Sequence, residues 1–328
     1  MTFSERDLID YIRSRLPSPP PWLRVPIGDD AAVLEPVRGA FDVLTTDTLV
    51  EGVHFDLAFS SPSDVGAKAL AVNLSDLAAM GAEPRAALLS LSVPRALPQA
   101  ALGALADAVV ASAALHRVAI AGGNVTSSPG PLVVTITATG TVKPRRALLR
   151  SGARPGDALY VSAAIGAAAA GLGMLRDGRT PANEDEAQCV GRYRVPVPRV
   201  RLGLLLARNR AATACIDLSD GLADGVRQIA EASGTGIVVE AEAVPVHPAA
   251  RRFFTDKGLD PVTAALAGGD DYELLFTASP RRRGALAPIV RLTSGLAITR
   301  IGAVTADRGV TLRRGGADEP LPEGYRHF

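Results

Sequence analysis

The chain has 328 residues, of which 47% are hydrophobic, and its 35 basic residues nearly balance its 34 acidic ones. A chain of this length usually folds as more than one domain, and a net charge of +1 argues against a nucleic-acid-binding or membrane-surface protein, because such proteins carry an excess of one sign. The first residues carry acidic side chains without an apolar stretch, and the uncharged, Ala-rich run at 158–175 is interrupted by glycines, so we expect a cytoplasmic protein.

Helix and strand patterns alternate along the first half of the chain. The spacing of apolar residues predicts a helix from about Pro62 through Asp76, and the alternation over 132–142 predicts the clearest strand. A short helix is expected to begin with a capping box at Ser4 and Asp7 and to end by Leu16, and an extended proline link follows at 17–21. A turn at 27–30 precedes a short strand. Further strands are expected at 42–46, 85–93 and 118–121, and a further helix at 98–115.

The second half begins after a basic and turn-rich stretch at 145–155. Expected elements there are strands at 158–162, 212–216, 236–239 and 272–277, helices at 165–175, 200–208 and 222–232, a polar loop through Gln188, and a last helix–strand pair that ends near Val304. Strands that alternate with helices predict an α/β (α+β) fold, with one domain at 1–148 and a second at 149–328.

A set of aspartates shares one local setting, in which each lies within two residues of Gly, Ser or Thr, most of them where an apolar segment ends. The set is Asp29, Asp30, Asp47, Asp76, Asp217, Asp220, Asp270 and Asp271. Strand ends and helix starts are where such folds place ligands, and carboxylates without clustered Cys or His favour Mg²⁺, Ca²⁺ or Mn²⁺ over zinc. Helix caps and Asx-turns select the same residue types and remain an alternative for each aspartate taken singly.

Several common site motifs are missing from the sequence. There is no G-x-x-x-x-G-K-[ST] loop, no G-x-G-x-x-G after a strand and no G-x-S-x-G. The two cysteines form no C-x-x-C pair, and the four histidines lie far apart, with only His54 beside the acidic segments. No residue is therefore assigned as a catalytic acid, base or nucleophile.

Six segments in order resemble a known family. They are I-G-D-D-A-A-V-L, T-T-D-T-L-V-E-G-V-H-F, K-A-L-A-V-N-L-S-D-L-A-A-M-G-A-E-P, G-G-N-V-T, I-D-L-S-D-G-L and G-G-D-D-Y-E-L, and the match continues to the terminal G-Y-R-H-F. The chain resembles the thiamine-monophosphate kinases, within the wider family of aminoimidazole-ribonucleotide-synthetase-like enzymes that use ATP. V-E-G-V-H-F and G-D-D-Y-E-L make the match specific.

The resemblance implies the transfer of a phosphoryl group from ATP to thiamine phosphate. It also implies N-terminal sheets that pair across a homodimer, and active sites in clefts between the two domains. By motif position it implies magnesium ligands at Asp30, Thr45, Thr46, Asp47, Asp76, Asp217 and Asp220, nucleotide contacts at Gly123, Asn124, Arg150 and Ser219, and substrate contacts at His54 and Asp270.

The sequence departs from the family pattern at two places. Asn124 stands where the family usually has an aspartate that binds magnesium, so we keep it as a metal ligand that brings no charge. A substrate position near the C-terminus falls at about Pro322 and is not carried over. The chemistry agrees with the resemblance, because joining two phosphates requires charge neutralisation and alignment rather than a base.

Three other functions remain open from the sequence. The chain could be another ATP-using member of the same family with a different acceptor. It could be a metal-dependent phosphohydrolase, because two-metal phosphatases also use aspartates at strand ends. It could also be a non-catalytic Ca²⁺-binding module, in which the aspartates only stabilise the fold.

Overall fold

The computed structural model describes residues 5–325, which divide into two compact units. The first unit comprises residues 5–77 and 83–144, and the second comprises 78–82 and 145–325. The expected helix cap at Ser4 and the end of the G-Y-R-H-F segment lie outside the described residues. Between residues 5 and 325, no helix combines the length and the apolar character that crossing a membrane requires.

The first unit contains a four-stranded sheet with strand order β3-β6-β4-β5, and a small β1-β2 pair. Only the β4–β5 pair of the larger sheet is parallel. The bounds are α1 Glu5–Arg15, β1 Leu23–Val25, β2 Val33–Leu34, β3 Phe41–Val50, α2 Pro62–Ala79, β4 Glu83–Pro94, α3 Gln99–Leu115, β5 Ala119–Ser128 and β6 Val133–Val142.

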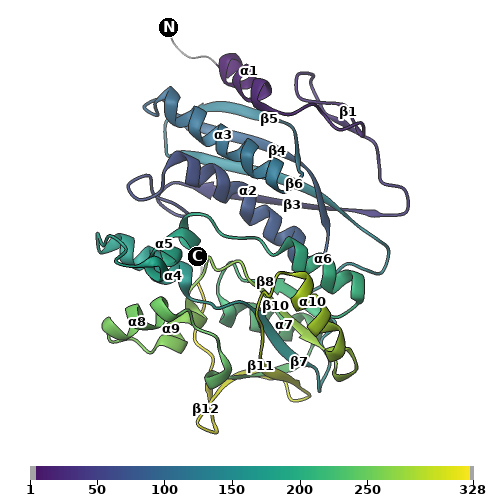
Figure 1. Cartoon of the computed structure of the whole chain (residues 1–328), viewed down its shortest axis with the longest axis vertical. Coiled ribbons are helices and arrows are strands. Elements are labelled where there is room, and N and C mark those ends of the chain that lie inside the picture. The colour runs from purple at the N-terminus through teal and green to yellow at the C-terminus, as the bar shows by residue number, and fades with distance from the viewer. Residues whose placement is uncertain (1–4, 326–328) are drawn as a thin grey trace. The chain divides into compact units, whose positions relative to one another are not determined.

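Helices α2 and α3 cover one face of this sheet, as Figure 1 shows. The two helices approach so closely that a Cβ atom at Gly66 of α2 would lie 2.3 Å from the carbonyl oxygen of Leu105 on α3. On β6, Val134 and Ile136 are fully buried, whereas the threonine between them is only half-buried. This alternation is the period of two that predicted the strand, with apolar side chains on the helix-covered face.

The second unit is built on a seven-stranded sheet with strand order β13-β12-β9-β11-β7-β10-β8. Its strands are β7 Ala158–Ser162, β8 Ala214–Asp217, β9 Gly236–Glu240, β10 Leu274–Ala278, β11 Ile298–Thr305, β12 Gly309–Arg314 and β13 Ala317–Pro320. Its helices are α4 Ala167–Arg176, α5 Glu184–Arg194, α6 Val200–Asn209, α7 Leu222–Ser233, α8 Pro248–Asp256, α9 Pro261–Ala267 and α10 Leu286–Leu292, with short 3₁₀ turns at Ala241–Ala243 and Pro280–Ala285.

The central strands of the second unit are buried on both faces. Along β7, Leu159 and Val161 belong to one core cluster with side chains of α4, α5, α7, α8 and α9, while Tyr160 belongs to another with side chains of α6 and α10. Tyr160 stacks on Phe276 of β10 with ring centroids 5.5 Å apart. Because both faces are covered, these strands are continuously apolar rather than alternating.

The structure confirms most of the predicted elements, corrects three, and adds α8, α9, β12 and β13, which were not predicted; the helix–strand pair that ends near Val304 is therefore not the last element. The predicted polar loop through Gln188 is wrong, because residues 184–194 form helix α5. The strand predicted at 118–121 continues to Ser128, so Gly122, Gly123 and Asn124 lie inside β5 rather than after it. Asp47 lies within β3 and not at its end.

Candidate active site

Strand β3 and helix α2 bring three of the predicted metal ligands together. The Thr45 hydroxyl on β3 donates a short hydrogen bond to the carboxylate of Asp76 on α2. Asp47 lies two residues beyond Thr45 and therefore on the same face of the strand. Asp76 is half-buried on a mainly apolar helix, and partners of this kind offset the cost of its partial burial.

Thr46 points to the opposite face of β3. Its hydroxyl lies 3.0 Å from that of Thr137 on β6, and it also donates to the backbone carbonyl of Ile136. The Thr46 side chain is therefore separated by the sheet from Asp47 and Asp76. If Thr46 binds the same metal ion as its neighbours, it does so with its backbone carbonyl.

His54 is held in the turn after β3 by two neighbours. The backbone N–H of Val50 donates to His54 Nδ1 at 3.1 Å, so the ring accepts at Nδ1. The ammonium of Lys68 on α2 donates to the His54 carbonyl at 3.1 Å. Lys68 is only 2% exposed, and its role was not predictable from the sequence, because a lysine in a helix is usually solvated.

A cavity of about 900 Å³ on the sheet of the first unit is lined by Asp30, Gly123 and Asn124, among other residues. Asp29 lines it too, and its carboxylate accepts the backbone N–H of Asp30 at 2.8 Å. The glycine is required by the neighbouring strand: a Cβ atom at Gly123 would lie 1.8 Å from the Leu89 carbonyl oxygen of β4.

Asp47 and Asn124 lie on opposite edge strands of this sheet. Asp47 pairs with Ile136, Ile136 with Leu89, and the next residue of β4 pairs with Asn124. Three strand spacings of about 4.8 Å separate them by roughly 14 Å. Mg²⁺ binds its oxygen ligands at about 2.1 Å, so these two residues of one copy cannot share an ion.

In the second unit, two loops carry the predicted site residues and are bonded through their backbones. Asp217 ends β8, and the Ser219 carbonyl accepts the N–H of Asp270 at 2.7 Å. The N–H of Tyr272 donates to the carbonyl of Leu218 at 2.9 Å. Both Asp270 (φ 67°) and Tyr272 (φ 49°) adopt the left-handed conformation. These contacts bring Asp217, Ser219, Asp220 and Asp270 together.

The two acids that follow Asp270 face the interior and support this loop. The Asp271 carboxylate accepts the backbone N–H of Gly166, just before α4, at 2.8 Å, and burial raises its pKa to about 8. Glu273 accepts a two-pronged ion pair from Arg199 and a 2.6 Å hydrogen bond from Ser162. The grouping of Asp271 with the ligand-facing aspartates is thus corrected, because its carboxylate anchors the loop to α4.

Arg150 precedes the second sheet and is oriented by helix α7. Its guanidinium donates to the side-chain oxygen of Gln228, whose amide in turn donates to the carboxylate of Asp224. The Arg150 carbonyl accepts the hydroxyl of Ser233 at 3.3 Å. Arg150 is itself exposed, so its remaining N–H groups can reach a ligand.

The C-terminal segment brings Tyr325, to which no role was assigned from the sequence, beside Asp220. Arg227 of α7 donates to the backbone carbonyls of Leu321 and Pro322 at 2.7 and 2.6 Å. The N–H of Tyr325 then donates to the Asp220 carbonyl at 3.2 Å. Pro322 is therefore a backbone anchor, and the half-exposed aromatic beside Asp220 is Tyr325. The contacts of Arg227 with Leu321 and Pro322 join residues almost a hundred positions apart, so no local sequence pattern predicts them.

The oxygen-rich groups fit a magnesium ion that is completed by phosphate oxygens. Among residues 5–325, no three His, Cys, Asp or Glu side chains form a ready-made metal cage. Mg²⁺ commonly takes one or two carboxylates together with substrate phosphates. In the first unit the Thr45–Asp76 pair can supply such oxygens, and in the second unit Asp217 can do so. Asn73, one turn before Asp76, also has a buried side-chain oxygen without a hydrogen-bond partner in the described structure.

Known proteins match most of the chain. The family model for the N-terminal domain of AIR synthase related proteins matches residues 28–142 of this chain, and the model for their C-terminal domain matches residues 154–315. The thiamine-monophosphate kinase of Salmonella typhimurium is 40% identical over 305 residues, which are 92% of this chain and 91% of that protein.

Two solved structures resemble this chain over nearly its whole length. The thiamine-monophosphate kinase of Stenotrophomonas maltophilia is 39% identical, with a TM-score of 0.85 over 97% of this chain and 99% of the other. A structure described as AaThiL complexed with AMPPCP and TMP is 32% identical, with a TM-score of 0.79 over 99% of this chain and 97% of the other.

Proposed function

The chain belongs to the AIR synthase related family and, within it, to the thiamine-monophosphate kinases; on that premise we propose how its own residues carry out the reaction. The activity is ATP-dependent phosphorylation of thiamine phosphate to thiamine diphosphate. The observation that carries it is the similarity, over 99% of the chain, to a structure complexed with AMPPCP and TMP.

The acidic groups of both units hold Mg²⁺ together with the triphosphate. When bound, Mg²⁺ neutralises the charge of the two reacting phosphates, which otherwise repel each other. In the first unit Asp76 and Asp47 supply carboxylates, and Thr45 adds a hydroxyl oxygen beside them. In the second unit Asp217 and Asp220 supply carboxylates from loops that backbone hydrogen bonds fix in place.

Other side chains bind and align the two substrates. Arg150, oriented by Gln228, pairs with the triphosphate, because a guanidinium matches phosphate oxygens in a two-pronged geometry. Asp270 and Tyr325 face the cationic thiamine, since a carboxylate and an aromatic ring both attract a positive ring system. The acceptor phosphate is already a nucleophile, so in-line transfer needs alignment and no general base.

A homodimer completes the first unit. The edge strands of its sheet, β3 and β5, each have a partner strand on one side only among the described residues. Leu44 on β3 is 71% exposed and Leu88 on β4 is 44% exposed, and exposed apolar side chains beside free strand edges favour covering by a second copy. Pairing of β3 with the β5 strand of a second copy brings the strands that carry Asp47 and Asn124 next to each other, whereas one copy holds them at opposite edges of its sheet.

Mixed dimers test this arrangement. Asp47→Ala and Asn124→Ala homodimers should both lose activity, and mixing the two variants should restore up to about a quarter of the parent activity if the residues act across the dimer. Absence of recovery, in mixtures whose subunits have demonstrably exchanged, would place both residues in one copy's site.

A product assay tests the function itself. Purified protein with Mg²⁺ and ATP should form thiamine diphosphate and ADP in equal amounts when thiamine phosphate is present, and little phosphate when it is absent. Phosphate release without the acceptor would favour a phosphohydrolase instead. The predicted cytoplasmic location and the division of roles between residues 1–148 and 149–328 stay predictions.

A further inference from the structure

A second cavity of the first unit lies outside the groups of residues assigned above. It has a volume of about 880 Å³ and is formed by the end of α1, the proline link 17–20, strand β1, the end of α3 and the start of β5. Its wall is mainly apolar, with Leu16, Trp22 and Ile27 among the lining side chains. The volume and the apolar lining are those of a small-molecule site.

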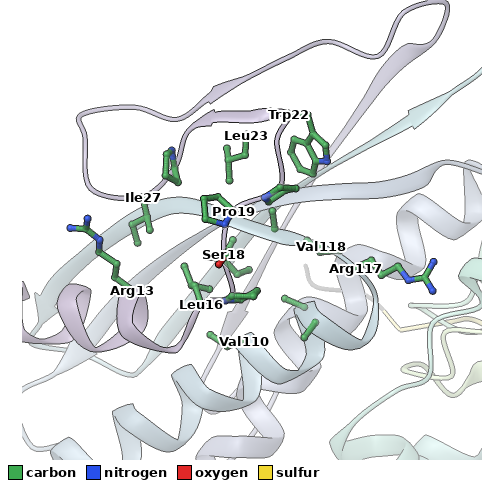
Figure 2. Close-up of a pocket in the computed structure, with 17 residues that line it drawn as sticks. Arg13, Leu16, Ser18, Pro19, Trp22, Leu23, Ile27, Val110, Arg117 and Val118 are labelled. Atoms are coloured by element: carbon green, nitrogen blue, oxygen red, sulfur yellow. The ribbon is translucent and has the colours of Figure 1, made fainter.

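The charged residues that line this cavity are all arginines. Figure 2 shows Arg13 and Arg117 at opposite ends of the lining side chains, with Leu16 and Pro19 between them. Among the described residues, none accepts a hydrogen bond from either guanidinium and none forms an ion pair with either one. No Asp or Glu lines the cavity. An apolar body with an anionic end complements this arrangement, because it fills the centre and pairs with a guanidinium.

Arg117 occupies a backbone position that does not suit it. It follows α3 with φ 57°, in the left-handed region where glycine or asparagine costs less. At the other end, the Arg13 guanidinium lies against the turn before Asp29: a Cβ atom at Gly28 would be 3.2 Å from Arg13 Nη1. Arg117 is thus held at one end of the cavity at a conformational cost, and Arg13 is held at the other end by close packing against the turn.

The cavity adjoins two segments of the proposed active site. Ile27 and Ile120 line both this cavity and the cavity of Asp30 and Asn124. Asp30 lies three positions after Ile27, and Asn124 lies four positions after Ile120. We propose that this cavity binds an amphipathic carboxylate, such as a medium-chain fatty acid, and that the bound acid changes the magnesium requirement of the kinase. The second part rests on the proposed function; the first does not.

Direct binding tests the first part. The fluorescent anion anilinonaphthalene sulfonate should bind the full-length protein saturably, and decanoate should displace it. Ala114→Trp, which fills the cavity from the exposed surface of α3, should abolish this binding, whereas Ala111→Trp, one turn earlier and outside the lining, should not. Equal binding by the parent and Ala114→Trp would overturn the proposal, as would the lack of any saturable binding.

The arginines provide the test of charge. Arg13→Gln and Arg117→Gln should each weaken decanoate binding about two- to five-fold, as expected for exposed ion pairs, and Arg6→Gln on the same helix as Arg13 should not. Arg117→Gly should weaken it likewise without lowering the Tm, since glycine suits the backbone there. Displacement by decanol as effective as by decanoate would refute the role of charge.

Enzyme assays test the second part separately. Decanoate should shift the Mg²⁺ concentration for half-maximal kinase activity of the parent and leave that of Ala114→Trp unchanged. Binding without such a shift would refute the regulatory part and keep the site. A parent protein without kinase activity would instead contradict the proposed function, while the fluorescence result would still stand.

Discussion

The buried carboxyl of Asp271 makes a quantitative prediction about stability and pH. Burial raises its pKa from 3.8 to about 8 in the folded protein. Between these values the folded state keeps a proton that the unfolded state has released, so the contribution of this group to stability is fully present at low pH and is lost as the pH rises toward 8. Each pH unit changes the free energy of unfolding by about 1.36 kcal/mol, or about 4 kcal/mol between pH 5 and pH 8.

Asp271→Asn should remove this dependence. The amide has nearly the same shape, does not titrate, and its oxygen can still accept the Gly166 N–H. The stability of the variant relative to the parent should therefore increase with pH by up to about 4 kcal/mol, which corresponds to about 8–16 °C in Tm for a unit of this size.

Calorimetry without Mg²⁺ at pH 5 to pH 8 measures the effect, with the exposed Asp256→Asn as the control. Parallel Tm profiles of Asp271→Asn and the parent would refute the raised pKa. A relative stability of the variant that falls with pH would show that the Gly166 N–H and the start of α4 keep the carboxylate ionised.

Three further substitutions test the account of the first unit. Gly123→Ala should lower the free energy of unfolding in urea by about 1–3 kcal/mol, because its Cβ atom would lie 1.8 Å from the Leu89 carbonyl oxygen. The control Gly122→Ala, whose Cβ atom would have its nearest contact at 3.4 Å, should be tolerated. Equal losses of stability in the two variants would contradict the close approach of β5 to β4. Lys68→Met should raise the KM for thiamine phosphate about ten-fold by leaving the His54 carbonyl without its charged donor, and an unchanged KM would remove His54 from the substrate site. Asn124→Asp should lower the Mg²⁺ concentration for half-maximal activity with little change in the KM for thiamine phosphate, because the added charge strengthens a metal ligand; identical magnesium titrations would show that residue 124 does not bind metal.

Elements with a clear period were predictable from the sequence, and those formed by tertiary contacts were not. The alternation of β6 and the apolar run of α2 carry their own signals. By contrast, G-G-N-V-T-S-S resembles a turn, yet pairing of Gly123 with Leu89 of β4 makes it a strand. Helix α5 was missed because its first turn is acidic and only Cys189, Val190 and Tyr193 form its buried side.

The site residues followed the same division. Loops that local motifs define, such as the one carrying Asp217 and Asp220, could be singled out from the sequence. The inward direction of Asp271 could not, because it depends on the N–H of Gly166, 105 residues earlier. Lys68 and Tyr325 were missed for a related reason: a buried lysine and a C-terminal aromatic have no local pattern that separates them from surface residues.

The central claim is that carboxylates from both units take part in one phosphoryl transfer. The most direct test measures the kcat for thiamine diphosphate formation by Asp76→Ala and Asp217→Ala at saturating ATP and thiamine phosphate, with the Tm of each variant as the control for folding. We expect each variant to keep a cooperative transition near that of the parent and to lose about a hundred-fold or more in kcat. Parent-like kcat in either folded variant at low millimolar Mg²⁺ would contradict the claim for that unit.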